Sequence, residues 1–348
     1  MKTNTLGRGG LRVSEFCLGT MTFGTQTGQA EAHAQIDAAL AAGINFVDTA
    51  EMYPTTPVRA ETIGDTETIL GAWNASNPGR RADYVLATKV SGEGLKAVRD
   101  GMPISRQTIE AAVDASLRRL DTDYIDLYQL HWPNRGSYHF RQNWTYAPNP
   151  VGKTGPLSHI VEVLETCQEL VKAGKLRHIG LSNETAWGVA QWIRVSEVKQ
   201  LPRVASIQNE YSLLCRLFDT DLAEASLYED VPCLSFSPLA AGLLTGKYQD
   251  GKVPDGSRKA LNGSLGGRAT ERVYPAVAAY ADIAQRHGLD LVHMALAFAA
   301  SRPFMGSVIF GATSLPQLDH ILNGLDLTLT DEVLAEIDAA HRAHPMPY

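Results

Sequence analysis

Residues 43–53 read Gly43-Ile44-Asn45-Phe46-Val47-Asp48-Thr49-Ala50-Glu51-Met52-Tyr53. The apolar run ends in an acid, and a tyrosine follows five residues later. Two further apolar runs end in polar residues, Lys89 and His131. Apolar runs of this length, bounded by turn residues, are typical of parallel strands buried on both faces. Such strands end on one common face, so we expect Asp48, Tyr53, Lys89 and His131 to lie together there.

Strand and helix patterns alternate along the whole chain. A doubly wound sheet is the main alternative to a barrel, but no G-x-G-x-x-G follows any strand. Eight strand–helix units in series therefore predict a closed (β/α)8 TIM barrel, formed as a single domain by residues 1–348. The expected strands are Glu15–Leu18, Asn45–Asp48, Tyr84–Lys89, Ile125–His131, His178–Ser182, Ser206–Gln208, Cys233–Ser237 and Val308–Phe310. The helices expected with the clearest signals are Ala30–Ala42, Arg106–Leu120, Ile160–Ala173 and Glu184–Val195, the last capped by Asn183.

Three segments lie outside the regular repeat. Lys2–Asn4 and Leu11–Ser14 resemble a hairpin that closes the bottom of the barrel. Long loops follow strands four and seven, from Asn134 to about Leu157 and from Leu239 to about Arg272. Both loops should lie on the C-terminal face, where barrel active sites are built.

Composition excludes several classes of protein. The 348 residues are 44% hydrophobic and 20% charged, as in an ordinary globular protein. The net charge of −7 argues against general binding to nucleic acid or to anionic membranes. No apolar stretch is long enough to span a membrane, and the N-terminus has no apolar signal-peptide core. Cys17, Cys167, Cys215 and Cys233 are scattered, which favours reduced thiols in a cytoplasmic protein.

The four polar residues at the strand ends form a set that can deliver a proton. Taken singly, each has a plain structural explanation: Asp48 as a helix cap, Tyr53 as a loop aromatic, His131 as a satisfied core histidine. A lysine that points into a barrel mouth must find a partner, and all four together are harder to explain by chance. Hydride attack on a carbonyl leaves charge on oxygen, and Tyr53 could protonate it. Lys89 would lower the pKa of Tyr53, Asp48 would orient Lys89, and His131 would position the carbonyl. A hydride carrier is required, since no side chain supplies hydride.

Nine ordered blocks of sequence resemble the aldo-keto reductases over nearly the whole chain. The likeness is closest to the bacterial Tas-type NADP(H)-dependent reductases and extends to the potassium-channel β subunits. The resemblance implies the barrel, reduction of aldehydes or ketones with NADPH, and the catalytic set Asp48, Tyr53, Lys89 and His131. The blocks are 18–24, 43–53, 87–89, 130–131, 179–183, 208–209, 235–239, 246–248 and 311–313.

The resemblance also implies where NADPH (NADP+) lies. The nicotinamide amide would meet Ser182, Asn183 and Gln208, and Phe236 would stack on its ring. The residues that would follow the pyrophosphate and touch the cofactor elsewhere are Ser237, Pro238, Leu239, Ala240, Gly242, Thr20, Met21, Gln26, Asp48 and Gly311. The residues that match a clamp for the 2′-phosphate are Lys247, Arg258, Thr313 and Gln317, the last two at the start of a helix.

One pair of positions departs from the family pattern. Ile321 and His320 stand where the family commonly has an Asn and a polar or acidic residue beside the adenine, so adenine contacts should differ here. No metal is expected, because the sequence has no metal-binding spacing and its ten histidines are dispersed.

Substrate specificity depends on loop residues. The proposed substrate contacts are Tyr53, His131, Trp132 and Trp144, with aromatic or medium-chain aldehydes favoured over sugars. An equally plain explanation is that the aromatic residues of the loop after strand four only pin that loop to the barrel rim. The expected partner is a small carbonyl substrate, and the chain should be a monomer or weak homo-oligomer. The alternatives are a redox-sensing, cofactor-binding regulatory subunit and a metal-dependent barrel hydrolase.

Overall fold

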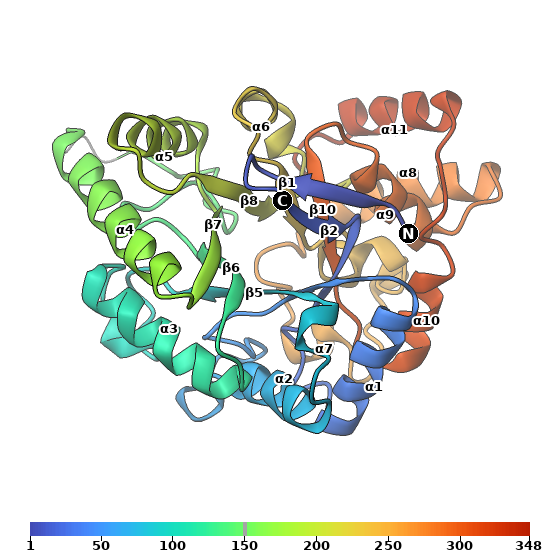
Figure 1. Ribbon diagram of the computed structural model, residues 1–348. Coiled ribbons are helices and arrows are strands. Elements are labelled where there is room, and N and C mark those ends of the chain that lie inside the picture. Colours follow the sequence, from blue (N-terminus) through green and yellow to red (C-terminus); the bar gives the residue numbers. More distant parts are fainter. Residues whose placement is uncertain (149–151) are drawn as a thin grey trace.

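A computed structural model describes residues 1–148 and 152–348. Eight parallel strands close into a barrel in the order β10-β3-β4-β5-β6-β7-β8-β9, which confirms the predicted (β/α)8 architecture. The helices surround the strands, and the β1–β2 hairpin lies across the middle of the ring in Figure 1. The barrel strands are β3 (Phe16–Gly19), β4 (Phe46–Asp48), β5 (Val85–Val90), β6 (Ile125–Leu130), β7 (Leu176–Ser182), β8 (Val204–Glu210), β9 (Cys233–Phe236) and β10 (Met305–Phe310).

The outer helices bury one face each against the barrel. In α3 the side chains of Ile109, Val113 and Leu120 recur at helical spacing and are buried. Ser105 caps this helix, and its hydroxyl accepts from the backbone N–H of Thr108. The helices are α1 (Gln29–Ala41), α2 (Asp65–Ser76), α3 (Arg106–Leu120), α4 (Thr154–Lys172), α5 (Ala186–Lys199), α6 (Asp221–Tyr228), α7 (Arg258–Leu261), α8 (Val273–Arg286), α9 (Leu291–Ala300), α10 (Leu315–Leu322) and α11 (Asp331–Ala343).

The hairpin of β1 (Thr3–Leu6) and β2 (Leu11–Ser14) closes the N-terminal end of the barrel, as expected. Leu6 and Val13 join the apolar cluster that fills the barrel interior, together with Cys17, Phe46, Ala87, Leu127, Ala205, Leu234 and Ile309. The Asn4 amide also donates to the Gly306 carbonyl at the start of β10, 2.9 Å away. The apolar filling leaves the opposite, C-terminal end for polar side chains.

Several predicted boundaries were wrong. The cap of α5 is Thr185, whose hydroxyl accepts from Gly188 N–H, and Asn183 instead has a left-handed backbone with φ of 52°. Helix α4 begins at Thr154, earlier than the predicted Ile160. The loop expected over Asn134–Leu157 includes residues 149–151, which lie outside the described residues. Within the described ranges, no helix is long and apolar enough to cross a membrane.

Candidate active site

The ends of four barrel strands carry a buried polar layer above the apolar filling. Asp48 ends β4, Lys89 lies near the end of β5, and Gln129 and Gln208 belong to β6 and β8. Parallel register places Lys89 beside Gln129, and all four side chains are almost completely buried. The strand ends therefore bring together residues that are far apart in the sequence.

Asp48 is the centre of this layer. Its Oδ2 accepts from Lys89 Nζ at 2.6 Å, and its Oδ1 accepts from Gln129 Nε2 at 3.0 Å and Gln208 Nε2 at 2.9 Å. Lys89 Nζ also donates to the Thr49 carbonyl at 2.7 Å. A buried ion pair that is completed by further hydrogen bonds is rigid, and its members cannot be removed singly without leaving an unpaired charge.

Charge on Lys89 is retained despite complete burial. Burial alone would lower its pKa, but the carboxylate of Asp48 and the neighbouring Tyr53 leave the pKa of Lys89 raised. Lys89 Nζ lies 5.1 Å from the centroid of the Tyr53 ring. The layer therefore places a permanent cation beside the tyrosine.

Tyr53 and His131 face one another edge to face at the mouth of the barrel, with ring centroids 5.8 Å apart. Desolvation raises the pKa of Tyr53, and the opposing effect of Lys89 does not cancel it. Lys89 lowers the pKa of Tyr53, as expected, but burial outweighs this effect and the net shift is upward. Burial, and then the charge of Lys89, lower the pKa of His131 well below its usual value. At neutral pH the site thus holds a protonated phenol and a neutral imidazole.

The residues expected at the nicotinamide adjoin this layer. Asn183 Nδ2 donates to the His131 carbonyl at 2.9 Å and to Ser182 Oγ at 3.0 Å. Asn183 Oδ1 is buried and has no hydrogen-bond partner among the described residues. The Gln208 amide nitrogen is engaged by Asp48 and by Gln129, which leaves its amide oxygen to accept from a ligand. A buried acceptor without a donor is costly, so this corner suits a ligand that carries an amide N–H.

The loop after β9 begins with an unusual backbone. Ser237, Ala240, Ala241 and Gly242 all have positive φ, between 47° and 92°. Left-handed conformations are costly for residues other than glycine and gather at ligand-binding sites, where successive N–H groups can face an anion. A Cβ on Gly242 would lie 3.2 Å from Lys247 Nζ, so the lysine amine lies against this backbone.

Lys247 and Arg258 are two of the cations in this loop. Among the described residues, neither Lys247 nor Arg258 forms an ion pair. Burial lowers the pKa of Arg258 to about 10, and nearby Arg268 adds to the effect. Arg258 also lies close enough to Tyr53 for each to shift the pKa of the other. An anion would relieve this accumulated positive charge, so the residues fit a phosphorylated cofactor.

At the start of α10, where the 2′-phosphate clamp was expected, the polar groups already bind one another. Thr313 donates from both its backbone N–H and its hydroxyl to Gln317 Oε1, each at 3.1 Å. The N–H of Leu315, at the start of α10, donates to the carboxylate of Glu31 from α1. Sequence reasoning missed Glu31, which occupies a position predicted for the 2′-phosphate and would have to give it up or share it.

The first loop joins the same rim. Thr20 Oγ1 donates to the Asp48 carbonyl at 2.9 Å, and Thr22 Oγ1 donates to the Ala312 carbonyl at 3.2 Å. These bonds hold the loop that carries Met21 and Gln26 against residues 311–313. The predicted cofactor residues therefore lie in loops, in barrel strands, or in the first turn of α7 and of α10.

A network anchored by the C-terminus supports this rim and was not foreseen. Arg268 donates to Glu210 at 2.7 Å and to the hydroxyl of Ser237 at 3.4 Å. Glu210 also accepts from Arg141 at 3.0 Å and from the Tyr348 hydroxyl at 3.2 Å. The signal in the sequence was Glu210, a charged residue at the end of the buried strand β8.

The structure separates the two tryptophans proposed as substrate contacts. Trp132 lies beside His131, with ring centroids 4.9 Å apart, and packs on the apolar cluster that includes Met52. Trp144 is 54% exposed and lies under the guanidinium of Arg272, 4.7 Å from the ring centroid. The loop residue that reaches Trp132 is Phe140, at 6.0 Å. The structure therefore places Trp132 against His131, and it places Trp144 against Arg272.

Comparisons with known proteins agree with this geometry. The family model described as "Aldo/keto reductase family" matches residues 15–342. Protein tas of Escherichia coli K12 is 44% identical, with 100% of this chain and 99% of that protein covered. The uncharacterized oxidoreductase YrpG of Bacillus subtilis is 32% identical, with 96% and 94% covered. A probable voltage-gated potassium channel subunit beta from rice is 31% identical, with 99% and 98% covered.

Proposed function

This chain belongs to the aldo/keto reductase family, and on that premise we propose that it reduces aldehydes or ketones to alcohols with NADPH, using Tyr53 as the general acid. The observation that carries the proposal is the buried Asp48–Lys89 pair beside the Tyr53–His131 mouth. Membership of the family by itself supports an oxidoreductase that acts on small carbonyl compounds.

The roles of the side chains follow from their protonation. NADPH, when bound, supplies hydride to the carbonyl carbon. Neutral His131 can donate a hydrogen bond to the carbonyl oxygen without giving up a proton. Tyr53 carries the proton that neutralises the developing alkoxide, which is a far stronger base than a phenolate. The cation of Lys89 stabilises the phenolate that remains, and Asp48 holds that cation in place.

The cofactor-binding residues divide by charge. Asn183 and Gln208 would hold the carboxamide of the nicotinamide through acceptor groups that the protein leaves free. Lys247 and Arg258 would bind the phosphates, and a preference for NADPH over NADH follows if either contacts the 2′-phosphate. Phe236, at the end of β9, would stack on the nicotinamide ring.

Steady-state kinetics test the proposal. A panel of carbonyl substrates that includes 4-nitrobenzaldehyde, xylose and glucose should give multiple turnovers, followed by the loss of NADPH absorbance. A redox-sensing regulatory subunit, the alternative raised by the similarity to the rice channel subunit, would bind NADPH tightly and stop after one turnover. Absence of catalytic turnover across the panel, with NADPH bound, would replace the enzyme proposal by the sensor.

A further inference from the structure

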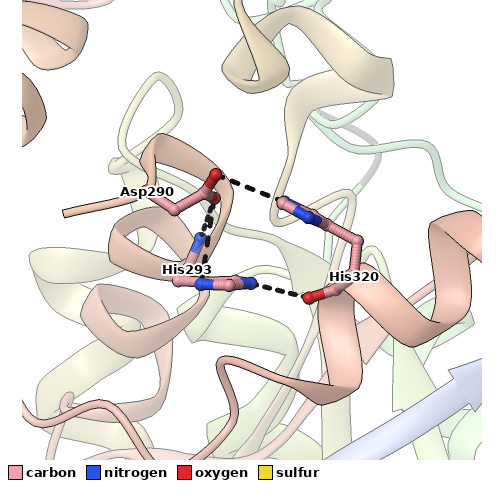
Figure 2. Close-up of side chains that lie close together, drawn as sticks. All are labelled: Asp290, His293 and His320. Atoms are coloured by element: carbon pink, nitrogen blue, oxygen red, sulfur yellow. Dashed lines mark hydrogen bonds and ion pairs between the residues drawn. The ribbon is translucent and has the colours of Figure 1, made fainter.

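Three possible metal ligands meet on the surface between α9 and α10 (Figure 2). Asp290 precedes α9, His293 lies in its first turn, and His320 lies near the end of α10. Their ligand atoms all lie within 4.8 Å of one another. Asp290 Oδ2 is 3.3 Å from His320 Nε2, and Asp290 Oδ1 is 4.0 Å from His293 Nδ1. The cluster shares no residue with the proposed catalytic set, and of its three members His320 is the one expected near the adenine.

The hydrogen bond of His293 fixes which of its nitrogens is free. His293 Nε2 lies 2.6 Å from the carbonyl oxygen of His320, which can only accept, so Nε2 carries the hydrogen. In the neutral ring, Nδ1 then carries a lone pair that faces the carboxylate of Asp290. Metal-binding histidines commonly donate their second N–H to a carbonyl in this way. Two facing acceptors repel one another unless a cation lies between them.

Two of the three ligands are held before any metal binds. Asp290 Oδ1 accepts from the backbone N–H groups of Val292 at 2.8 Å and His293 at 3.1 Å. The His293 ring packs so closely on Gly324 that a Cβ there would lie 2.1 Å from it. An aspartate carboxylate is ordinarily ionised at neutral pH, so this ligand is available to a cation.

The spacing suits a small divalent transition metal. Zinc binds imidazole nitrogen and carboxylate oxygen at about 2.0–2.2 Å, so neighbouring ligands of a tetrahedral site lie about 3.3 Å apart. The Asp290–His320 pair already has this separation, and the Asp290–His293 pair needs to close by less than an ångström. The His320 side chain is 50% exposed, so an ion and a completing water can enter from solvent.

We propose that Asp290, His293 and His320 bind one divalent transition-metal ion of the Zn²⁺ type, which ties α9 to α10. Two nitrogen ligands and one carboxylate favour Zn²⁺, Ni²⁺ or Cu²⁺ over Mg²⁺. Sequence spacing could not reveal the site, because its ligands come from two helices that are distant in the chain. The proposal does not depend on the nature of the catalysed reaction.

Isothermal titration of the untagged full-length protein with Zn²⁺ tests the site. We expect one equivalent to bind wild type, and at least about 10–100-fold weaker binding in His320→Gln and in Asp290→Asn. Asparagine keeps the cap of α9, so the second variant removes charge without removing the cap. His287→Gln is the matched control, since His287 pairs with Glu336 at 3.1 Å and no third ligand joins that pair among the described residues.

Thermal unfolding gives an independent measurement. Zn²⁺ should raise the Tm of wild type and of His287→Gln, because it binds only the folded state, and should leave both site variants unchanged. Mg²⁺ should not shift any of the four proteins. The proposal is overturned if wild type binds no stoichiometric Zn²⁺, or if His320→Gln and Asp290→Asn bind it as tightly as wild type.

Discussion

The buried polar layer of Asp48, Lys89, Gln129 and Gln208, which forms the floor of the barrel mouth, differs from the loop after β9 in how its charges are paired. In the floor, Asp48 and Lys89 form an ion pair, and two glutamines donate the remaining hydrogen bonds to the carboxylate. In the loop, Lys247 and Arg258 have no acidic partners among the described residues, and the backbone holds left-handed conformations. The hydrogen bonds of the floor are complete without a ligand, whereas the loop carries positive charge and left-handed backbone that a bound anion would offset.

The contrast teaches which substitutions affect folding and which affect binding. Removing a member of the floor leaves a buried charge unpaired, so stability and turnover fall together. Removing a cation from the loop takes away repulsion between like charges, so the free energy of unfolding is kept. It also removes a contact to the anionic ligand, so the affinity for that ligand falls. Each prediction below tests one side of this division.

Lys89→Met should have the largest effect. The substitution leaves the buried carboxylate of Asp48 without a cation, which lowers the free energy of unfolding by about 3–5 kcal/mol. It also lowers turnover about 10²–10⁴-fold. Urea unfolding and steady-state kinetics measure the two losses. Lys175→Met is the control, because the Lys175–Asp114 pair is at the surface and should contribute less than about 1 kcal/mol. Equal stabilities of the two variants would show that the floor is not a preassembled unit.

The Lys247→Ala, Arg258→Ala double variant should affect binding alone. Two charge-assisted contacts to phosphate contribute about 1.5–3 kcal/mol each, so Kd for NADPH should rise at least about 100-fold with the unfolding free energy unchanged or raised. Fluorescence titration with NADPH and NADH measures the effect and the preference. Lys252→Ala, in the same loop but paired with Asp250, should bind as wild type does. If wild type binds both cofactors equally, the loop does not read the 2′-phosphate.

Trp132→Ala and Trp144→Ala distinguish a substrate wall from a loop clip. Trp132 adjoins His131, and loss of an aromatic contact of about 0.5–1.5 kcal/mol should raise KM for 4-nitrobenzaldehyde up to about tenfold. Trp144, packed under Arg272 at the surface, is the matched control and should leave KM unchanged. Wild type should also show a higher kcat/KM for 4-nitrobenzaldehyde than for xylose. A larger rise in KM for Trp144→Ala than for Trp132→Ala would show that Trp144 contacts the substrate.

The pH profile should show the smallest change. The pKa of His131 is lowered, so its ring stays neutral as the pH falls through the usual histidine range near 6.5. The pKa of Tyr53 is raised, so its proton is kept past about pH 10. We therefore expect kcat for reduction to be flat between roughly pH 6 and 9. A step in kcat near pH 6.5 that is absent in His131→Asn would contradict the neutral imidazole.

The barrel, and the meeting of Asp48, Tyr53, Lys89 and His131 at one end of it, could be predicted from sequence because the strands follow from periodicity. Apolar runs that end in Asp48 and Lys89 specify strands, and parallel strands bring their ends together without any knowledge of the loops. Gln129 could have been predicted too, since it belongs to β6 and lies two residues before His131, which directly follows that strand.

The remainder of the site depends on contacts that sequence spacing does not encode. Glu31 reaches the start of α10 from another helix, and Tyr348 reaches Glu210 from the end of the chain. The net pKa of Tyr53 depends on how burial compares with the charge of Lys89, and only coordinates give that balance. Which loop tryptophan faces the mouth likewise follows from packing, not from pattern.

Turnover of Tyr53→Phe at saturating NADPH tests the central claim most directly. The account predicts that this variant binds NADPH with wild-type affinity and folds normally, yet reduces 4-nitrobenzaldehyde about 10²–10⁴-fold more slowly because the proton of the phenol is missing. Tyr228→Phe, on an exposed tyrosine, should match wild type in the same assay. Near-normal turnover of Tyr53→Phe, with NADPH bound, would contradict the account.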